Sequence, residues 1–188
     1  MTSRFEFRRR LAVVPGKSQE EPILARWLHP ERILCNVTAA GAEDLFDLAA
    51  TQVGQARGID PAPVRRALSR REQAESTALG GGFAIPHARI GGIAEPLTVL
   101  IRLESSIAFK APDDLPVALF LVILVPLGDQ CAHLRLLAVV AELFSDREFR
   151  RRLDGAADAS ATSDVLRRGV AAIRPSLAAQ HGRYGVPY

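Results

Sequence analysis

The stretch that decides the fold is VALFLVILV, residues Val117–Val125. It is apolar at every position and lacks the alternation that marks a strand with one face in water. The run is too short to cross a bilayer as a helix, which takes about 20 residues. Pro126 and Gly128 follow it and are expected to end it. The run therefore predicts a central strand that other elements cover on both faces.

Strands and helices alternate on either side of this run. Further strands are expected at residues 33–37, 83–85 and 97–103. Helical spacing predicts helices over residues 45–56, 61–72, 134–144, 147–154 and 163–173. Their boundaries are marked by Asp60-Pro61, Asp146 and Ser163 as starts and by Gly58, Gly155 and Pro175 as stops. This order predicts an α/β protein, a three-layer α/β/α sandwich around a central mixed sheet.

The chain divides into three parts. Residues 1–30 mix Arg, Glu, Pro and Gly without periodicity and are expected to form an N-terminal extension. Residues 31–175 carry the strand and helix patterns and form the domain. Residues 176–188 contain Gly182, Gly185 and Pro187 and are expected to be a loose C-terminal tail.

Composition excludes several classes of protein. The chain has 188 residues, 48% of them hydrophobic, which is enough for a folded core. Its net charge is only +3 and its aromatic content 6%, so nothing favours a nucleic-acid partner. Two cysteines in a chain of this length argue against a disulfide framework. We expect a soluble cytoplasmic protein without membrane insertion and without a cofactor.

The segment GGGFAIPHAR, Gly80–Arg89, raises the functional question. Pro86 cannot donate a ladder hydrogen bond, so the preceding strand should end there or lie on an edge, with His87 at a strand end. The glycines, Gly80 and Gly82 among them, permit positive φ and the close approach of another molecule. Successive backbone N–H groups in such a loop can also form an anion nest.

The chemistry of this segment suits a phosphohistidine. A neutral imidazole is a good nucleophile because its ordinary pKa is about 6.5. The hydroxyls of Ser76 and Thr77 and the guanidinium of Arg71 offer donors that would stabilise a phosphoryl group on His87. The plainer interpretation is a flexible glycine turn followed by a polar strand end, and no G-x-x-x-x-G-K-[ST] phosphate loop is present.

The longer segment REQAESTALGGGFAIPH, Arg71–His87, resembles the active-site signature of the type 2 EIIA domains. These domains belong to the fructose/mannitol and nitrogen-regulatory branch of the bacterial phosphoenolpyruvate:sugar phosphotransferase system. The resemblance runs from about Ile33 to Arg174, and His133-Leu134 matches the family's second histidine segment. It implies a phosphocarrier with an α/β/α fold.

The resemblance also implies the roles of individual residues. A histidine phosphocarrier of the HPr type would donate its phosphoryl group to Nε2 of His87. His133 would lie beside the phosphorylated ring, and Arg71 would line the same pocket. A zinc site built from the two histidines lacks a third ligand, so no metal is expected.

The chain departs from the family's pattern where relatives carry glycine. Here those positions are Glu75, Ala78 and Ala88. A positive φ at Ala78 would cost about 1 kcal/mol or more. The carboxylate of Glu75 would disfavour phosphate unless it points outward.

The sequence is therefore compatible with three functions. The favoured one is a stand-alone carrier of the nitrogen-regulatory branch, which controls partners through its phosphorylation state. The alternatives are a sugar-specific EIIA that passes phosphate to a separate EIIB, and an interaction module that is not phosphorylated. The run Arg150–Arg152 is either a solvated helix face or a docking surface for an acidic partner.

Overall fold

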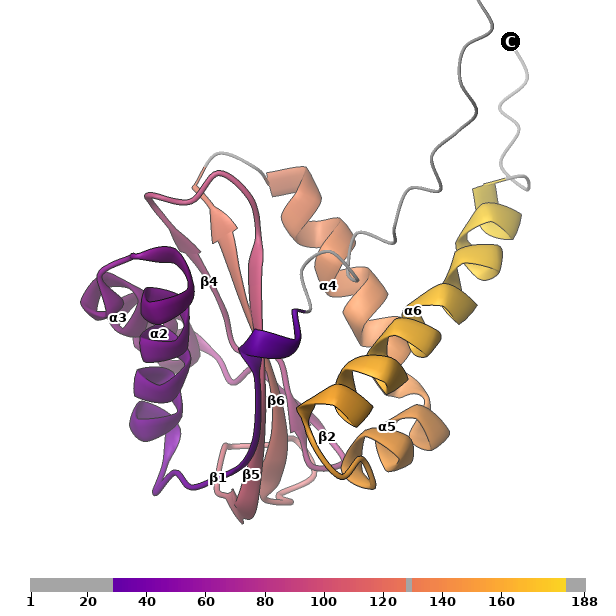
Figure 1. Cartoon of the computed structure of the whole chain (residues 1–188), viewed down its shortest axis with the longest axis horizontal. Coiled ribbons are helices and arrows are strands. Elements are labelled where there is room, and N and C mark those ends of the chain that lie inside the picture. Colours follow the sequence, from indigo (N-terminus) through magenta and orange to yellow (C-terminus); the bar gives the residue numbers. More distant parts are fainter. Residues whose placement is uncertain (1–28, 128–129, 182–188) are drawn as a thin grey trace, which may run out of the picture.

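Three layers build the protein (Figure 1). The computed structural model describes residues 29–127 and 130–181, without the side chains of residues 130–136 and 173–181. Helices α2 (Ala42–Arg57) and α3 (Pro61–Ala74) cover one face of the sheet, after a short 3-10 turn η1 (Pro30–Arg32). Helices α4 (Gln130–Ser145), α5 (Arg147–Asp154) and α6 (Ala159–His181) cover the other. The predicted α/β/α sandwich is confirmed.

The central sheet is mixed, as predicted. Its path runs β1-β5-β6-β3-β2, with β4 also paired to β6. The strands are β1 (Ile33–Val37), β2 (Ala78–Gly80), β3 (Phe83–Ala84), β4 (His87–Ile90), β5 (Leu97–Ile107) and β6 (Val117–Pro126). β6 is antiparallel to β5 and parallel to β3 and β4, while β2 returns antiparallel to β3.

β6 is the central strand that its apolar run predicts. Phe120, Val122 and Leu124 pack on the side of α2 and α3, whereas Leu121 and Ile123 pack on the side of α4 to α6. All five side chains are fully buried. The absence of alternation in the sequence thus reflects a strand with two buried faces.

β3 and β4 form one interrupted strand along the outer edge of β6. Phe83 lies opposite Leu119 and His87 opposite Ile123, so the register is the same on both sides of the break. The carbonyl of Pro86 still accepts a hydrogen bond of 2.8 Å from the N–H of Ile123. The prediction that the strand ends at the proline or lies on an edge is confirmed, since β3 ends at Ala84 and His87 begins β4, an edge strand on β6. A proline at a sheet edge removes one donor but leaves its carbonyl in the ladder.

Helix boundaries follow their capping residues. Asp60 accepts from the N–H of Ala62 at the start of α3, and Asp146 accepts from Glu148 at the start of α5, both as predicted. The predicted start of the last helix at Ser163 is wrong, because the Asp158 carboxylate accepts from the N–H of Ala161 at 2.8 Å and caps α6 earlier.

The predicted end of this helix at Pro175 is also wrong, since α6 continues to His181. A proline removes only one backbone N–H donor from a helix, so the helix can continue past it with a kink. Residues 1–28 and 182–188 lie outside the described residues, so the extension and the tail beyond α6 stay predictions. No helix in the described ranges is long and apolar enough to cross a membrane.

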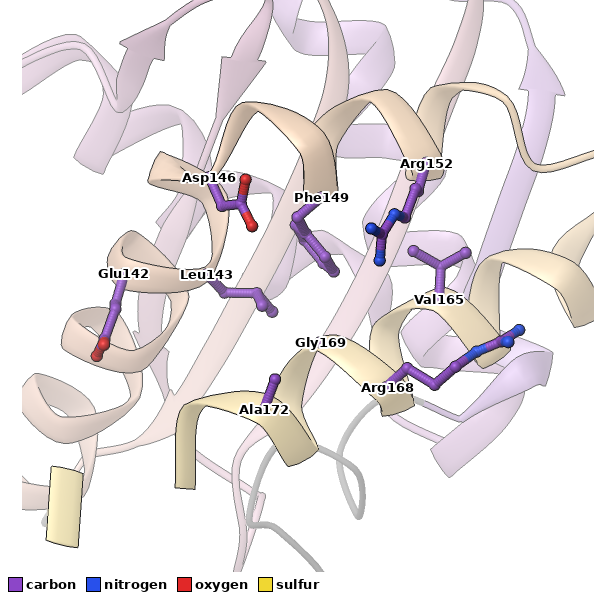
Figure 2. A pocket seen from close by; sticks show the side chains of 9 residues that line it. All are labelled: Glu142, Leu143, Asp146, Phe149, Arg152, Val165, Arg168, Gly169 and Ala172. Carbon is purple, nitrogen blue, oxygen red and sulfur yellow. The ribbon is translucent and has the colours of Figure 1, made fainter. Parts of the chain in front are cut away.

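Gly169 lets α6 pack closely on α4 and α5. A Cβ at this position would lie 2.5 Å from Cε2 of Phe149 and 2.8 Å from Cδ1 of Leu143. Figure 2 shows both side chains directed toward the α6 backbone at Gly169. Phe149 is buried and packs edge-on against Phe144, so its ring has little room to move.

We expect Gly169→Ala to lower the free energy of unfolding by about 1 kcal/mol, because overpacking outweighs the gain in helix propensity. Urea denaturation measures this. Gly91→Ala is the matched control, since its added methyl group would meet only Leu127 Cδ1 at 3.6 Å. A Gly169→Ala protein as stable as the wild type would contradict the packing argument.

Candidate functional site

His87 is held at both ring nitrogens. Its Nε2 lies 3.1 Å from Nε of Arg71, in the last turn of α3. Its Nδ1 lies 2.8 Å from the carbonyl oxygen of Ile85. An arginine side chain has only donors and a carbonyl only accepts, so the contacts require a hydrogen on Nδ1 and a lone pair on Nε2. The nucleophilic atom of this histidine is therefore Nε2.

The surroundings keep the ring neutral. Burial is the main cause that lowers the pKa of His87 below its ordinary value of 6.5, and the positive charge of Arg71 lowers it further. The Ile85 carbonyl acts in the opposite direction without reversing the shift. A neutral imidazole with its lone pair on Nε2 is the form that attacks phosphorus.

An open hollow of about 410 Å³ lies in front of the ring. It is lined by Ala67, Arg70, Arg71, His87, Ala88 and Arg89. Three of these side chains are cations and none is a carboxylate. Arg71 is oriented by a second hydrogen bond of 2.8 Å from its Nη1 to the Glu75 carbonyl. The hollow is thus suited to an anion, and within the described residues no three His, Cys, Asp or Glu side chains gather to hold a metal.

The elements that carry His87 and Arg71 lie within a stretch of the chain that matches a known protein family. The sequence model of the family described as "Phosphoenolpyruvate-dependent sugar phosphotransferase system, EIIA 2" matches residues 26–168. The chain belongs to this family. The matched residues include both His87 and Arg71.

Relatives support the same assignment. The nitrogen regulatory protein of Pseudomonas aeruginosa is 32% identical over 76% of this chain and 94% of its own length. The fructose-specific EIIA component of Haloferax volcanii is 34% identical over 69% of this chain and 82% of its own. The crystal structure of IIA-Ntr from Neisseria meningitidis has a TM-score of 0.73 and 30% identity, covering 77% and 99% of the two chains.

The hydroxyls of Ser76 and Thr77 donate to partners other than His87 in this EIIA domain. The hydroxyl of Ser76 donates to the carbonyl of Phe109 at 2.9 Å. Thr77 is buried, and its hydroxyl and its N–H both donate to the Glu72 carboxylate, at 2.5 and 3.1 Å. These bonds fix the turn between α3 and β2. The predicted contact of both hydroxyls with a phosphoryl group stays a prediction.

The glycines are also separate from His87. Gly80, Gly81 and Gly82 all have positive φ; Gly80 ends β2, and Gly81 and Gly82 form the turn to β3. The N–H of Gly81 donates to the Asp113 carboxylate at 2.6 Å, which lowers the pKa of Asp113. Gly82 precedes His87 by five residues, or about 16 Å of extended strand. The structure therefore does not bring Gly80 and Gly82 to the histidine.

The departures from the family's glycines cost little. Neither Ala78 nor Ala88 has a positive φ, because both lie within strands, β2 and β4. Glu75 is exposed, and its carbonyl rather than its carboxylate faces Arg71. Ala78 and Ala88 therefore add no backbone strain, and Glu75 does not direct its negative charge at Arg71.

His133 lies in the first turns of α4, as its sequence position predicts. Its side chain falls outside the described part of the chain, so its place beside His87 stays a prediction.

Sequence reasoning missed two residues of the hollow, Arg70 and Arg89. A signal for Arg89 was available, because it stands two positions after His87 in one strand. Arg70 precedes Arg71 directly, but which of two adjacent helical arginines meets a given strand depends on the packing of α3.

A larger hollow of about 620 Å³ lies elsewhere, between α4, α5 and α6 (Figure 2). Its lining includes Leu143, Phe149 and Val165 together with Arg152 and Glu142. Among the side chains that the structure describes, no histidine, cysteine or hydroxyl group lines it. The larger hollow therefore offers no nucleophile among these side chains, and the hollow of His87 stays the candidate site.

We expect His87 to titrate below pH 6.5. Because its pKa is lowered on folding, the ring stays neutral as pH falls through 6.5 and gains its proton only at lower pH. Proton NMR of the imidazole C2–H, assigned with His87→Ala, measures the midpoint. The same residue in denaturant provides the control near 6.5, and a folded-state midpoint above that value would contradict the assignment.

Proposed function

We propose that this EIIA domain carries a phosphoryl group on Nε2 of His87, received from a histidine phosphocarrier of the HPr type. It would do so in the cytoplasm, in the nitrogen-regulatory branch. The observation that carries the proposal is the lone pair of Nε2, presented beside Arg71 in a hollow that no carboxylate of the described residues lines.

The transfer step needs no base. The lone pair of His87 Nε2 forms the new bond to phosphorus while the P–N bond of the donor phosphohistidine breaks. The electrons of that bond return to the donor ring, which leaves as a neutral imidazole. The hydrogen on Nδ1 stays in place, and its bond to the Ile85 carbonyl stabilises the positive charge that the phosphorylated ring acquires.

Arg71 would change partners during this step. Before transfer its Nε–H occupies the Nε2 lone pair, so the incoming phosphorus must displace it. Phosphoryl oxygens then arrive at the same position, and a guanidinium binds such oxygens with charge-assisted hydrogen bonds. The bond to the Glu75 carbonyl keeps the side chain nearby throughout.

The regulatory branch is favoured by the nitrogen regulatory proteins among the relatives. The fructose-specific relative from Haloferax volcanii keeps a second function open, in which the phosphoryl group passes to a separate EIIB. An interaction module that is not phosphorylated is the third function, and it is disfavoured because Ala78 and Ala88 introduce no strain.

Phosphorylation tests the proposal directly. Incubated with phosphoenolpyruvate, the first enzyme of the system and an HPr-type carrier, the protein should gain the mass of one phosphoryl group in an acid-labile form. His87→Ala should abolish the gain and His29→Ala, the control, should retain it. A gain that survives in His87→Ala would refute the site, and none in the wild type would favour the interaction module.

Onward transfer separates the two phosphorylated functions. A labelled protein that passes its phosphoryl group to a sugar-specific EIIB would belong to the sugar branch. Label that stays on the EIIA domain while changing its affinity for a regulated protein would support the nitrogen branch.

Arg71→Gln should slow phosphorylation by about 10²-fold, because it removes a charged donor from the transferring group. Rapid-quench kinetics with the carrier measures the rate, and circular dichroism checks the fold. Arg57→Gln, at a surface ion pair with Glu95, is the control and should react at the wild-type rate. An unchanged rate in Arg71→Gln would show that Arg71 has no part in the transfer.

A further inference from the structure

Glu72 forms a clamp on the turn that follows α3. It is the only acidic residue of that helix and is half-buried. The N–H of Thr77 donates to both of its oxygens at 3.1 Å, and the Thr77 hydroxyl donates to Oε2 at 2.5 Å. Glu72 forms no ion pair with any residue that the structure describes, although Arg71 is its neighbour in the chain. Its carboxylate is therefore engaged by Thr77.

The clamp belongs to a closed circuit of hydrogen bonds that includes His87. The carbonyl of Thr77 accepts from the N–H of Ile85 at 3.0 Å. The carbonyl of Ile85 lies 2.8 Å from Nδ1 of His87, and Nε2 of the same ring lies 3.1 Å from Nε of Arg71. Arg71 and Glu72 are consecutive, so the circuit begins and ends on one turn of α3. A shift at Glu72 would thus reach the ring from the side of Nδ1.

Burial makes the clamp hard to replace by water. Thr77 and Ile85 are both buried, with 5% of each residue exposed. Without an acceptor at Glu72, the N–H and the hydroxyl of Thr77 would be left unpaired inside the protein, which is unfavourable. The turn would relax toward solvent and move the Thr77 carbonyl with it. Ile85 would then lose its fixed position opposite Nδ1.

The circuit also keeps negative charge away from the reacting atom. A carboxylate that orients a histidine commonly bonds the ring directly. Here the neutral carbonyl of Ile85 has that position, and the carboxylate of Glu72 is not part of the lining of the hollow. The ring is held in one tautomer without a carboxylate beside the incoming anion.

We propose that Glu72 is a positioning residue for the phosphoryl transfer to His87. Through Thr77 and Ile85 it keeps the hydrogen on Nδ1 and so directs the Nε2 lone pair beside Arg71. Its part in the reaction rests on the proposed function, in which the orientation of the nucleophile sets the rate of transfer.

Exchange of the Nδ1 hydrogen with water tests this link without a phosphoryl donor. Glu72→Met removes both acceptor oxygens at nearly constant side-chain length, and Glu72→Gln retains one of them. The exchange is measured by NMR of the nitrogen-labelled ring at about pH 8, where the imidazole is neutral. It should be about tenfold faster in Glu72→Met and close to wild type in Glu72→Gln.

The matched control is Glu43→Met. The carboxylate of Glu43 also accepts from a hydroxyl of α3, that of Ser69, and it pairs with Arg65. It lies outside the circuit, and Arg65 keeps a second partner in Asp47. Exchange at Nδ1 of His87 should be as slow in this variant as in wild type.

The effect on the reaction is measured with the HPr-type carrier. Glu72→Met should lower kcat about tenfold and leave KM within about twofold of wild type, because orientation acts on the transfer step and not on docking. Glu72→Gln should recover most of the rate. A Thr77 hydroxyl that contacts the phosphoryl group would give another pattern, in which Thr77→Val slows the reaction and Glu72→Met does not; this pattern would refute the positioning role.

Exchange as slow in Glu72→Met as in wild type would overturn the positioning role, whatever the rate of phosphorylation. Equal acceleration in Glu43→Met would do so too, because it would indicate a general loosening of α3. If Glu72→Met does not fold, Thr77→Val decides: it removes only the hydroxyl bond, so exchange should rise about threefold, and no rise would refute the proposal. Absence of phosphorylation of the wild type would remove the proposed function, whereas the exchange rates would still show whether Glu72 holds the ring.

Discussion

The site depends on the pairing of one edge strand with β6. β6 is buried on both faces, so the register of the segment along its outer edge is fixed by the core. Pro86 interrupts that segment without shifting it. At the interruption the Ile85 N–H turns to the Thr77 carbonyl, and the Ile85 carbonyl is left for Nδ1 of His87. The same proline that breaks the ladder thereby selects the tautomer that exposes the Nε2 lone pair.

The second half of the site depends on the end of α3. Arg71 reaches His87 because the Glu75 carbonyl holds its guanidinium one helical turn further on. Glu72 closes the following turn by accepting from the N–H and the hydroxyl of Thr77. Thr77 then provides the carbonyl that binds Ile85. One chain of hydrogen bonds thus links the helix that carries the arginine to the strand that carries the histidine.

Periodicity was enough to predict the long elements but not the short ones. The apolar run of β6 and the helical stripes of α2 to α5 identify their elements because burial sets the pattern. β2 and β4 were missed since strands of three and four residues show no period and Pro86 suggested a stop. The roles of His87 and Arg71 were suggested by residue chemistry and by the signature. The partners of Ser76 and Gly81 were not, because Phe109 and Asp113 come from a distant loop.

The signature segment Arg71–His87 therefore combines two separate structural features. Its glycine part builds a hairpin turn in which Asp113 accepts from Gly81 and the Arg150 guanidinium would lie 3.3 Å from an added Cβ. Its proline-histidine part, at the other end of the edge strand, carries the histidine that we propose to be phosphorylated. Ala78 and Ala88 occupy extended positions between or beside these parts, where an alanine fits as well as a glycine. The conformational freedom that glycine supplies is needed only at the hairpin, so losing it near His87 leaves the reactive geometry intact.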